Sequence, residues 1–221
     1  MLPLFHDFSD ETVLVFGGGR VGLRKARFFA QEANVIVVST EFADELRVAS
    51  QIRAHVAPDS LSDWFDRTDP ALVVAATDDG ALNEAIERSA RERGILINRA
   101  DQHGARDIGS IVVPATVRDG DVVTAIGTGG RSPALSKQLR RQIEPLLRGA
   151  DSMADLTAVL REELKERGIS TEKRRQAIHA VVKSESVWGA IEDERDGNGD
   201  SGGTDARAEA ERVVSDSLNR D

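Results

Sequence analysis

A glycine-rich turn between an apolar strand and a helix is the feature that most constrains what this chain can fold into. The segment TVLVFGGG is apolar and ends in glycines, and RVGLRKARFFAQEA follows it with apolar residues at helical spacing. Gly17, Gly19 and Gly22 match the pattern G-x-G-x-x-G. In that pattern the first glycine makes a tight turn, the second admits a pyrophosphate, and the third lets the helix pack on the strand. The turn therefore predicts a parallel sheet that binds a dinucleotide.

Strands and helices alternate through the residues that follow. Further strands are predicted by NVIVVST, RAHVAP, ALVVAATDD and ILINRAD, and helices by the stretch from Glu41 to Gln51 and by ALNEAIERSARERG. This alternation predicts an α/β fold with a Rossmann-like parallel sheet and right-handed crossovers. We assign this domain, which we expect to bind a dinucleotide, to residues 1–109.

The pattern changes after the fifth predicted strand. The segment SIVVPATVRDGDVVTAIGT predicts two antiparallel strands joined around Asp119-Gly120, and SPALSKQLRRQIEPLL predicts a helix that Pro145 ends or kinks. More helices follow, including one from about Ser170 to Trp188. We therefore expect a hairpin-plus-helix segment at residues 110–149 and a small helical domain at residues 150–190.

The last segment, residues 191–221, is acidic. It has ten acidic and four basic residues, a net charge of −6, and it contains the polar run DGNGDSGGTDA. High net charge with few large apolar residues favours a solvated, disordered tail.

Composition argues against several classes of function. The net charge of −9 argues against a nucleic-acid binder, which normally shows a basic face. We find no apolar run long enough to span a bilayer, and MLPLFHDFSD lacks the basic start and cleavage site of a signal peptide. The absence of cysteine excludes disulfides and thiolate metal sites, and the four histidines show no metal-ligand spacing. We therefore expect a cytoplasmic protein with no membrane partner and no metal site of its own.

The residues expected at the cofactor lie where predicted strands end. The usual ribose-binding carboxylate comes slightly late, as Glu41, so either Glu41 or the hydroxyls of Ser39 and Thr40 bind the ribose, unless Glu41 is only a surface residue that starts a helix. Spacing alone leaves the choice between NAD and its 2′-phosphorylated form open. Asp78 faces the ligand crevice, unless it or Asp79 only caps the following helix. The predicted cofactor set is Gly17, Gly19, Arg20, Val21, Gly22, Ser39, Thr40, Glu41, Thr77 and Asp78.

A further carboxylate, Asp101, follows the fifth predicted strand. Ligands of open parallel sheets bind beyond the carboxyl ends of the strands, so Asp101 should point into the same crevice. It is either a general base or a turn-forming aspartate.

A second glycine loop, GTGGRSPAL, opens another predicted helix. Ser132 is a good N-cap and Pro133 fits the first turn, which leaves backbone N–H groups free to hold an anion. From Arg99 to Arg148 there are eight basic and five acidic residues, a net charge of +3 in a chain of −9. This local charge indicates either a polyanionic partner or a solvated helix face. We expect the first loop to hold the cofactor and the second, with Arg131 and Lys137, to hold an acidic substrate.

Taken together, these stretches resemble the precorrin-2 dehydrogenase family, the N-terminal module of siroheme synthases. The resemblance covers about residues 2–148, and more loosely the helical region to about Ile191. It is carried, in order, by LPLFHDF, VLVFGGGRVGLRKARFF, VVAATDDGALN, ILINRAD and GSIVVPATVRDGDVVTAIGTGGRSPALSKQLRRQIE. The glycine fingerprint is common to many families, whereas ILINRAD followed by TGGRSPAL is far more specific.

The resemblance implies NAD-dependent oxidation of precorrin-2 to sirohydrochlorin, in a homodimer whose middle segment packs across the two-fold axis. It implies that Asp101 is the catalytic carboxylate. Some members of the family also insert ferrous iron into sirohydrochlorin, and Asp101 would serve both reactions, so iron as a second substrate stays open. A different class, an NAD-sensing regulatory module without catalysis, is the alternative. The substrate-binding set is Thr128, Gly129, Gly130, Arg131, Ser132 and Lys137, with Thr128 standing where the family commonly has serine.

Overall fold

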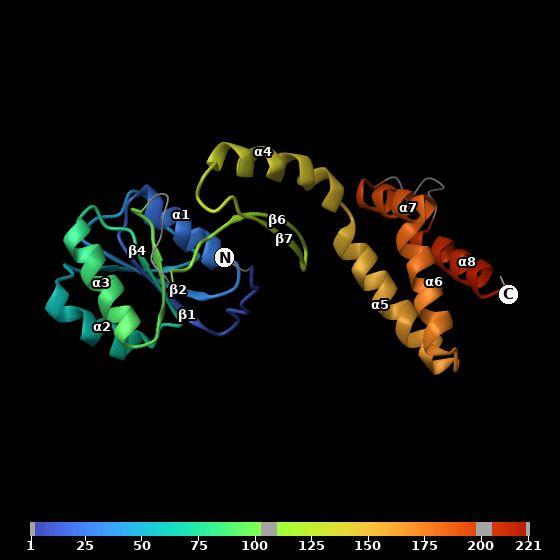
Figure 1. Ribbon diagram of the computed structural model, residues 1–221, viewed down its shortest axis with the longest axis horizontal. Coiled ribbons are helices and arrows are strands. Elements are labelled where there is room, and N and C mark those ends of the chain that lie inside the picture. Colours follow the sequence, from blue (N-terminus) through green and yellow to red (C-terminus); the bar gives the residue numbers. More distant parts are fainter. Residues whose placement is uncertain (1–2, 103–109, 198–204, 220–221) are drawn as a thin grey trace. The chain divides into compact units, whose positions relative to one another are not determined.

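The computed structural model of the chain describes residues 3–102, 110–197 and 205–219, and it divides into two compact units (Figure 1). The first, here called the sheet unit, comprises Met1–Pro114 and Thr128–Ser132. The second, here called the helical unit, comprises Ala115–Gly127 and Pro133–Asp221.

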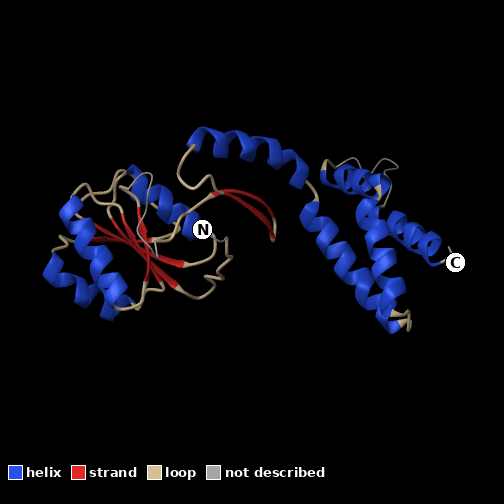
Figure 2. Cartoon of the chain, in the orientation of Figure 1, coloured by secondary structure: helices blue, strands red, loops and turns tan. Residues whose placement is uncertain are grey.

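The sheet unit is built on five parallel strands in the order β3-β2-β1-β4-β5. The central strand β1 pairs with β2 through Leu14 and Ile36 and with β4 through Leu14 and Val73. Figure 2 shows helices on both sides of these strands, so the predicted α/β fold is confirmed. The strands are β1 (Thr12–Phe16), β2 (Asn34–Ser39), β3 (Ser50–Arg53), β4 (Leu72–Ala75) and β5 (Leu96–Arg99), and the helices are α1 (Arg20–Phe29), α2 (Leu61–Thr68) and α3 (Gly80–Glu92).

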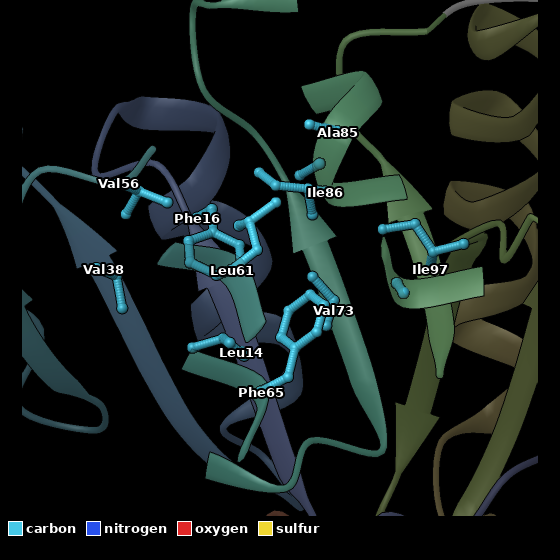
Figure 3. Close-up of a cluster of buried hydrophobic side chains, with 12 residues drawn as sticks. Leu14, Phe16, Val38, Val56, Leu61, Phe65, Val73, Ala85, Ile86 and Ile97 are labelled. Carbon is cyan, nitrogen blue, oxygen red and sulfur yellow. The ribbon is translucent and has the colours of Figure 1, made fainter. Parts of the chain in front are cut away.

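The core of this unit lies on both faces of the sheet, because successive side chains of a strand point to opposite faces. On one face, Phe16 and Val73 pack with Phe65 of α2 and Ile86 of α3 (Figure 3). On the other face, the strand residues Val13, Val15, Val37 and Val74 pack with Leu23, Ala26 and Phe29 of α1. Burial on both faces explains why β1 and β4 are apolar at nearly every position rather than alternating.

The segment between β2 and β3 differs from the sequence prediction. Residues 41–49 form no helix, and the strand lies at Ser50–Arg53 rather than at RAHVAP. The side chain of Gln51 explains the difference, since its oxygen accepts the backbone N–H of Leu46 and its amide donates to the carbonyl of Asp44. These two bonds satisfy backbone groups that would otherwise be paired within a helix. The side chain of Leu46 in this loop is buried.

The helical unit begins with the expected hairpin, β6 (Ala115–Asp119) and β7 (Val122–Ile126), which are antiparallel. The helix α4 (Pro133–Ile143) follows the second glycine loop, and a 3-10 turn, Glu144–Leu147, replaces it where Pro145 removes a backbone donor. The helices α5 (Ala150–Glu166), α6 (Thr171–Lys183), α7 (Glu185–Arg195) and α8 (Ala206–Leu218) complete the unit. The predicted helix from Ser170 to Trp188 is thus two helices, and Ser184 caps the second by accepting the N–H of Val187.

The prediction of a disordered tail over residues 191–221 is wrong for the parts that belong to α7 and α8. Ala206, Ala210 and Val214 recur at intervals of four and are buried against α5, α6 and α7. Asp205 caps α8 by accepting the N–H groups of Arg207 and Ala208. The net charge of residues 191–221 gave no sign of this narrow apolar face, which is formed largely by small side chains. The polar run at 198–204 lies outside the described residues.

Candidate functional site

A cavity of about 510 Å³ lies at the carboxyl edge of the sheet, beside the turn from β1 to α1. The edge collects polar residues because all five strands run in the same direction and end there. Seven of the residues predicted to bind cofactor line the cavity: Gly17, Gly19, Ser39, Thr40, Glu41, Thr77 and Asp78.

The glycines of the first turn have distinct structural roles. Gly17 has φ +116°, and a Cβ there would overlap the carbonyl oxygen of Ala76. A Cβ at Gly22, within α1, would overlap the carbonyl oxygen of Gly17. Gly19 is different, because a Cβ built on it meets no atom within 4 Å. The turn is therefore tight around Gly17 and Gly22 and open at Gly19, the position at which a pyrophosphate would approach the N-terminus of α1.

Three of the predicted cofactor residues do not line the cavity, and two residues that were not predicted do. Arg20, Val21 and Gly22 do not line it, and Val21 is 41% exposed on α1. Gly18 and His55 do line it, and the sequence analysis did not select either. His55 follows β3, so the misplacement of that strand concealed it, whereas Gly18 could have been found as the middle glycine of the run.

The loop from β4 to α3 is fixed by a buried amide. Asn83, fully buried on α3, accepts hydrogen bonds from the backbone N–H (3.1 Å) and the hydroxyl (2.7 Å) of Thr77. Its own amide donates to the carbonyl of Thr77 at 2.9 Å. Asp79 caps α3 by accepting the N–H groups of Ala81 and Leu82, so the capping alternative applies to Asp79. Asp78 is left exposed in the cavity wall.

Asp101 is held by an arginine that lies two residues before it, at the end of β5. The Nε and Nη2 atoms of Arg99 donate to the two carboxylate oxygens at 2.8 and 2.7 Å. The Nη1 atom of Arg99 donates at 2.7 Å to Glu87 of α3. The bidentate contact with Arg99 lowers the pKa of Asp101, against the opposing effect of burial, and a hydrogen bond from Asn83 lowers the pKa further. In the sequence, Arg99 could be identified only as one of the positive charges of residues 99–148.

The second glycine loop closes on itself before α4. Gly129 and Gly130 have φ +63° and +77°, conformations that favour glycine. The hydroxyl of Thr128 accepts the N–H of Ser132 at 3.3 Å and donates to its carbonyl at 3.2 Å. Threonine thus makes the local bonds that a serine could make at this position. Lys137 is exposed on the next turn of α4.

The described ranges contain neither a membrane-spanning helix nor a cluster of metal ligands. Within them no helix is both long and apolar enough to cross a membrane. Across residues 3–102, 110–197 and 205–219, no three histidine or carboxylate side chains gather as they would around a metal ion.

The chain is similar to several known proteins. Residues 4–115 match the family model described as "Putative NAD(P)-binding". The chain is 40% identical over 196 residues to a precorrin-2 dehydrogenase of Methanosarcina barkeri, a match that covers 85% of each protein. It is 32% identical over 179 residues to a siroheme synthase of Nitrosomonas europaea, covering 79% of this chain but 37% of that relative. Its fold resembles the solved structure of "SirC, precorrin-2 dehydrogenase", with a TM-score of 0.64 and 22% identity over 83% of this chain and 90% of that one.

Proposed function

The chain belongs to the precorrin-2 dehydrogenase family, and on that premise we propose that it oxidises precorrin-2 to sirohydrochlorin with NAD as the hydride acceptor. The observation that carries the proposal is the pairing of a dinucleotide-type cavity with a fixed carboxylate at the same sheet edge. The cavity contains Thr77, which Asn83 of α3 holds, and Asp101 follows the neighbouring strand β5, where Arg99 binds both of its carboxylate oxygens. The cofactor loop and the proposed catalytic residue therefore lie at the ends of adjacent parallel strands.

The charges around the cavity support NAD rather than its 2′-phosphorylated form. The cavity lining includes Glu41, Asp78 and Asp79, and none of the described residues that line it is a lysine or an arginine. A 2′-phosphate adds about two negative charges and normally requires an arginine, whereas a carboxylate such as Glu41 accepts the ribose hydroxyl. The pyrophosphate would be held by backbone N–H groups at the N-terminus of α1, where Gly19 leaves room for it.

Oxidation of the substrate removes one hydride and one proton. A C–H bond of the macrocycle breaks and its electron pair leaves with the hydride. A proton is then lost from a neighbouring atom of the macrocycle, and the electron pair that it leaves behind forms the new double bond, so the products are sirohydrochlorin, NADH and a proton. Bound NAD supplies the hydride acceptor. Asp101 stays ionised because Arg99 holds its pKa low, so it would stabilise the positive charge that develops on the macrocycle as hydride leaves. A low pKa makes Asp101 a weak proton acceptor, and this favours the electrostatic role over general-base catalysis.

The substrate carries several carboxylates, and the second glycine loop suits such a ligand. We assign carboxylate binding to the backbone and side chains of Thr128, Gly129, Gly130, Arg131, Ser132 and Lys137. Arg131 and Lys137 are exposed, and the turn at Gly129 and Gly130 precedes the N-terminus of α4.

A homodimer would cover the hairpin and α4. An isolated two-stranded hairpin is at best marginally stable in water, and β6 and β7 pair with no other described strand. The helix α4 has no buried residue along its length, and Leu135 and Leu146 are 49% and 76% exposed. An amphipathic helix normally buries its apolar stripe, so we propose that a second copy covers this surface.

The test is oxidation of precorrin-2 by the purified protein, followed by the tetrapyrrole spectrum and by NADH formation. Asp101→Asn should bind NAD with wild-type affinity and lose at least tenfold in kcat. Asp66→Asn, which alters an exposed carboxylate of α2, is the matched control and should keep wild-type kcat. Tight NAD binding by the wild-type protein without any oxidation would instead support the sensor alternative.

A further inference from the structure

The carboxylate of Asp101 is one end of a chain of four charged side chains that alternate in sign. Arg91 contacts Glu87 at 2.7 Å, Glu87 contacts Arg99 at 2.7 Å, and Arg99 contacts Asp101 at 2.7 Å. The two central side chains are buried, with 7% of Glu87 and 4% of Arg99 exposed. The two ends reach solvent, since Arg91 is 38% and Asp101 30% exposed.

Burial of the central pair is not explained by stability alone. Removing two charges from water costs free energy that their attraction only partly offsets, and apolar side chains of similar size are often as stabilising. The near neighbours of Glu87 and Arg99 along the chain, Ile86 and Ile97, belong to an apolar cluster, so an apolar pair would suit this part of the sheet unit. The buried Glu87–Arg99 pair also orients Asp101, because Arg99 makes a bidentate contact that fixes both carboxylate oxygens of Asp101.

The backbone restricts Asp101 further. The N–H of Ala100 donates to the carbonyl of Ala75 at 2.9 Å, which extends the β4–β5 pairing up to the residue before Asp101. Asn83, which holds Thr77 of the cofactor loop, also helps to lower the pKa of Asp101. Asp101 is thus held by its own strand and by Arg99.

We infer that Arg99 and Glu87 are positioning residues that fix the Asp101 carboxylate as an oriented anion at the reaction site. Arg99 holds the carboxylate directly. Glu87 binds the guanidinium of Arg99 and keeps it in the orientation in which it can donate to both oxygens of Asp101. The inference rests on the proposed function, because it assigns these two residues to the same reaction. Neither residue lines the cavity, so neither is expected to touch the cofactor.

The pH dependence of kcat gives a readout that a merely structural role would not move. Arg99 is the main cause that lowers the pKa of Asp101, and the groups around this contact include Asn83 and, behind Arg99, Glu87 and Arg91. Without Arg99 the pKa of Asp101 rises toward or above its ordinary value. The carboxylate would then be protonated at a higher pH, and the acid limb of the kcat profile would move upward.

The experiment measures kcat, KM for precorrin-2, and NAD affinity across pH for Arg99→Met, Arg99→Lys and Glu87→Gln. We expect Arg99→Met to lose about 10- to 100-fold in kcat, the scale of a misplaced catalytic group, with its acid limb moved to higher pH. Arg99→Lys keeps the charge and should recover part of kcat. Glu87→Gln should lose less, and all three should bind NAD within about twofold of wild type.

Asp66→Asn is the control, since it breaks an exposed arginine–carboxylate pair at the far end of α3. It should leave kcat and the acid limb unchanged. If Arg99→Met does not fold, Arg99→Lys and Glu87→Gln decide the matter, because each should lose kcat while NAD affinity stays within about twofold of wild type. Folded variants with wild-type kcat and an unmoved acid limb would overturn the inference, whereas an inactive wild-type protein would overturn the proposed function instead.

Discussion

Two glycines of the same turn should fail in different ways when each is replaced by alanine. In Gly22→Ala, the new methyl overlaps the carbonyl oxygen of Gly17 and lies 3.0 Å from its carbonyl carbon. Both groups are backbone, so α1 must shift away from the turn. Overpacking of this kind costs about 1–3 kcal/mol, and the better helix propensity of alanine offsets up to about 1 kcal/mol. We expect a net loss of roughly 1–2 kcal/mol in the free energy of unfolding.

Gly19→Ala should leave the fold nearly intact. Gly19 has φ −72° and ψ 176°, which alanine adopts freely, and its Cβ would enter open space. Gly19 is the N-cap of α1, a position where alanine is less favourable than glycine by less than about 1 kcal/mol. The methyl would, however, occupy the space through which a pyrophosphate reaches the backbone. A loss of about 1.4 kcal/mol or more in binding corresponds to at least tenfold weaker NAD affinity.

Thermal unfolding without NAD and calorimetric titration with NAD separate the two effects. A destabilisation of 1 kcal/mol lowers Tm by roughly 2–4 °C in a chain of this size, so Gly22→Ala should lower Tm by roughly 2–8 °C. Gly19→Ala should change Tm by less and lose NAD affinity. If Gly19→Ala binds NAD as tightly as wild type, the cofactor does not approach this turn. If Gly22→Ala keeps the wild-type Tm, the packing argument is wrong.

Three further outcomes follow from the rest of the chain. Neutralising Arg131 and Lys137 to glutamine should raise KM for precorrin-2 about tenfold with little change in kcat, and an unchanged KM in steady-state assays would contradict the substrate assignment. If the proposed homodimer forms through α4, Leu135→Asp, on the exposed stripe of that helix, should be a monomer in sedimentation velocity. Val214→Ala should cost about 2 kcal/mol and lower Tm by roughly 4–8 °C in calorimetry, whereas Ser215→Ala, exposed on the same helix, should not.

The parts of the fold that the sequence predicted correctly are those specified by local patterns. The glycine turn, the apolar strands and the hairpin at Asp119-Gly120 each depend on residues within about ten positions of one another. The segment between β2 and β3 escaped prediction because Gln51 satisfies backbone groups five and seven residues earlier, a pairing without a sequence signature. The helix α8 was not predicted because net charge does not distinguish one face of a helix from another, whereas Ala206 and Val214 lie on the same apolar face.

The candidate site was predicted in part for the same reason. Residues at strand ends could be placed in the cavity, since parallel strands bring their carboxyl ends to one edge. Their connections could not be predicted. Asn83 lies six residues after Thr77, and Glu87 lies twelve residues before Arg99 on another element. Such contacts depend on how α3 packs against β4 and β5, which is a property of the tertiary structure.

Asp78 and Asp101 show why residue type alone does not assign a role at this edge. Both follow neighbouring parallel strands, β4 and β5, and the sequence offers a functional and a structural interpretation for each: cofactor contact or helix cap for Asp78, and general base or turn for Asp101. In the structure Asp78 is exposed in the cavity wall, whereas Arg99 holds both oxygens of Asp101. An exposed carboxylate can rotate to meet the hydroxyls of a cofactor, while a fixed one suits a reaction centre that needs charge in one place. The environment that α3 supplies, through Glu87 and Asn83, therefore distinguishes the two aspartates.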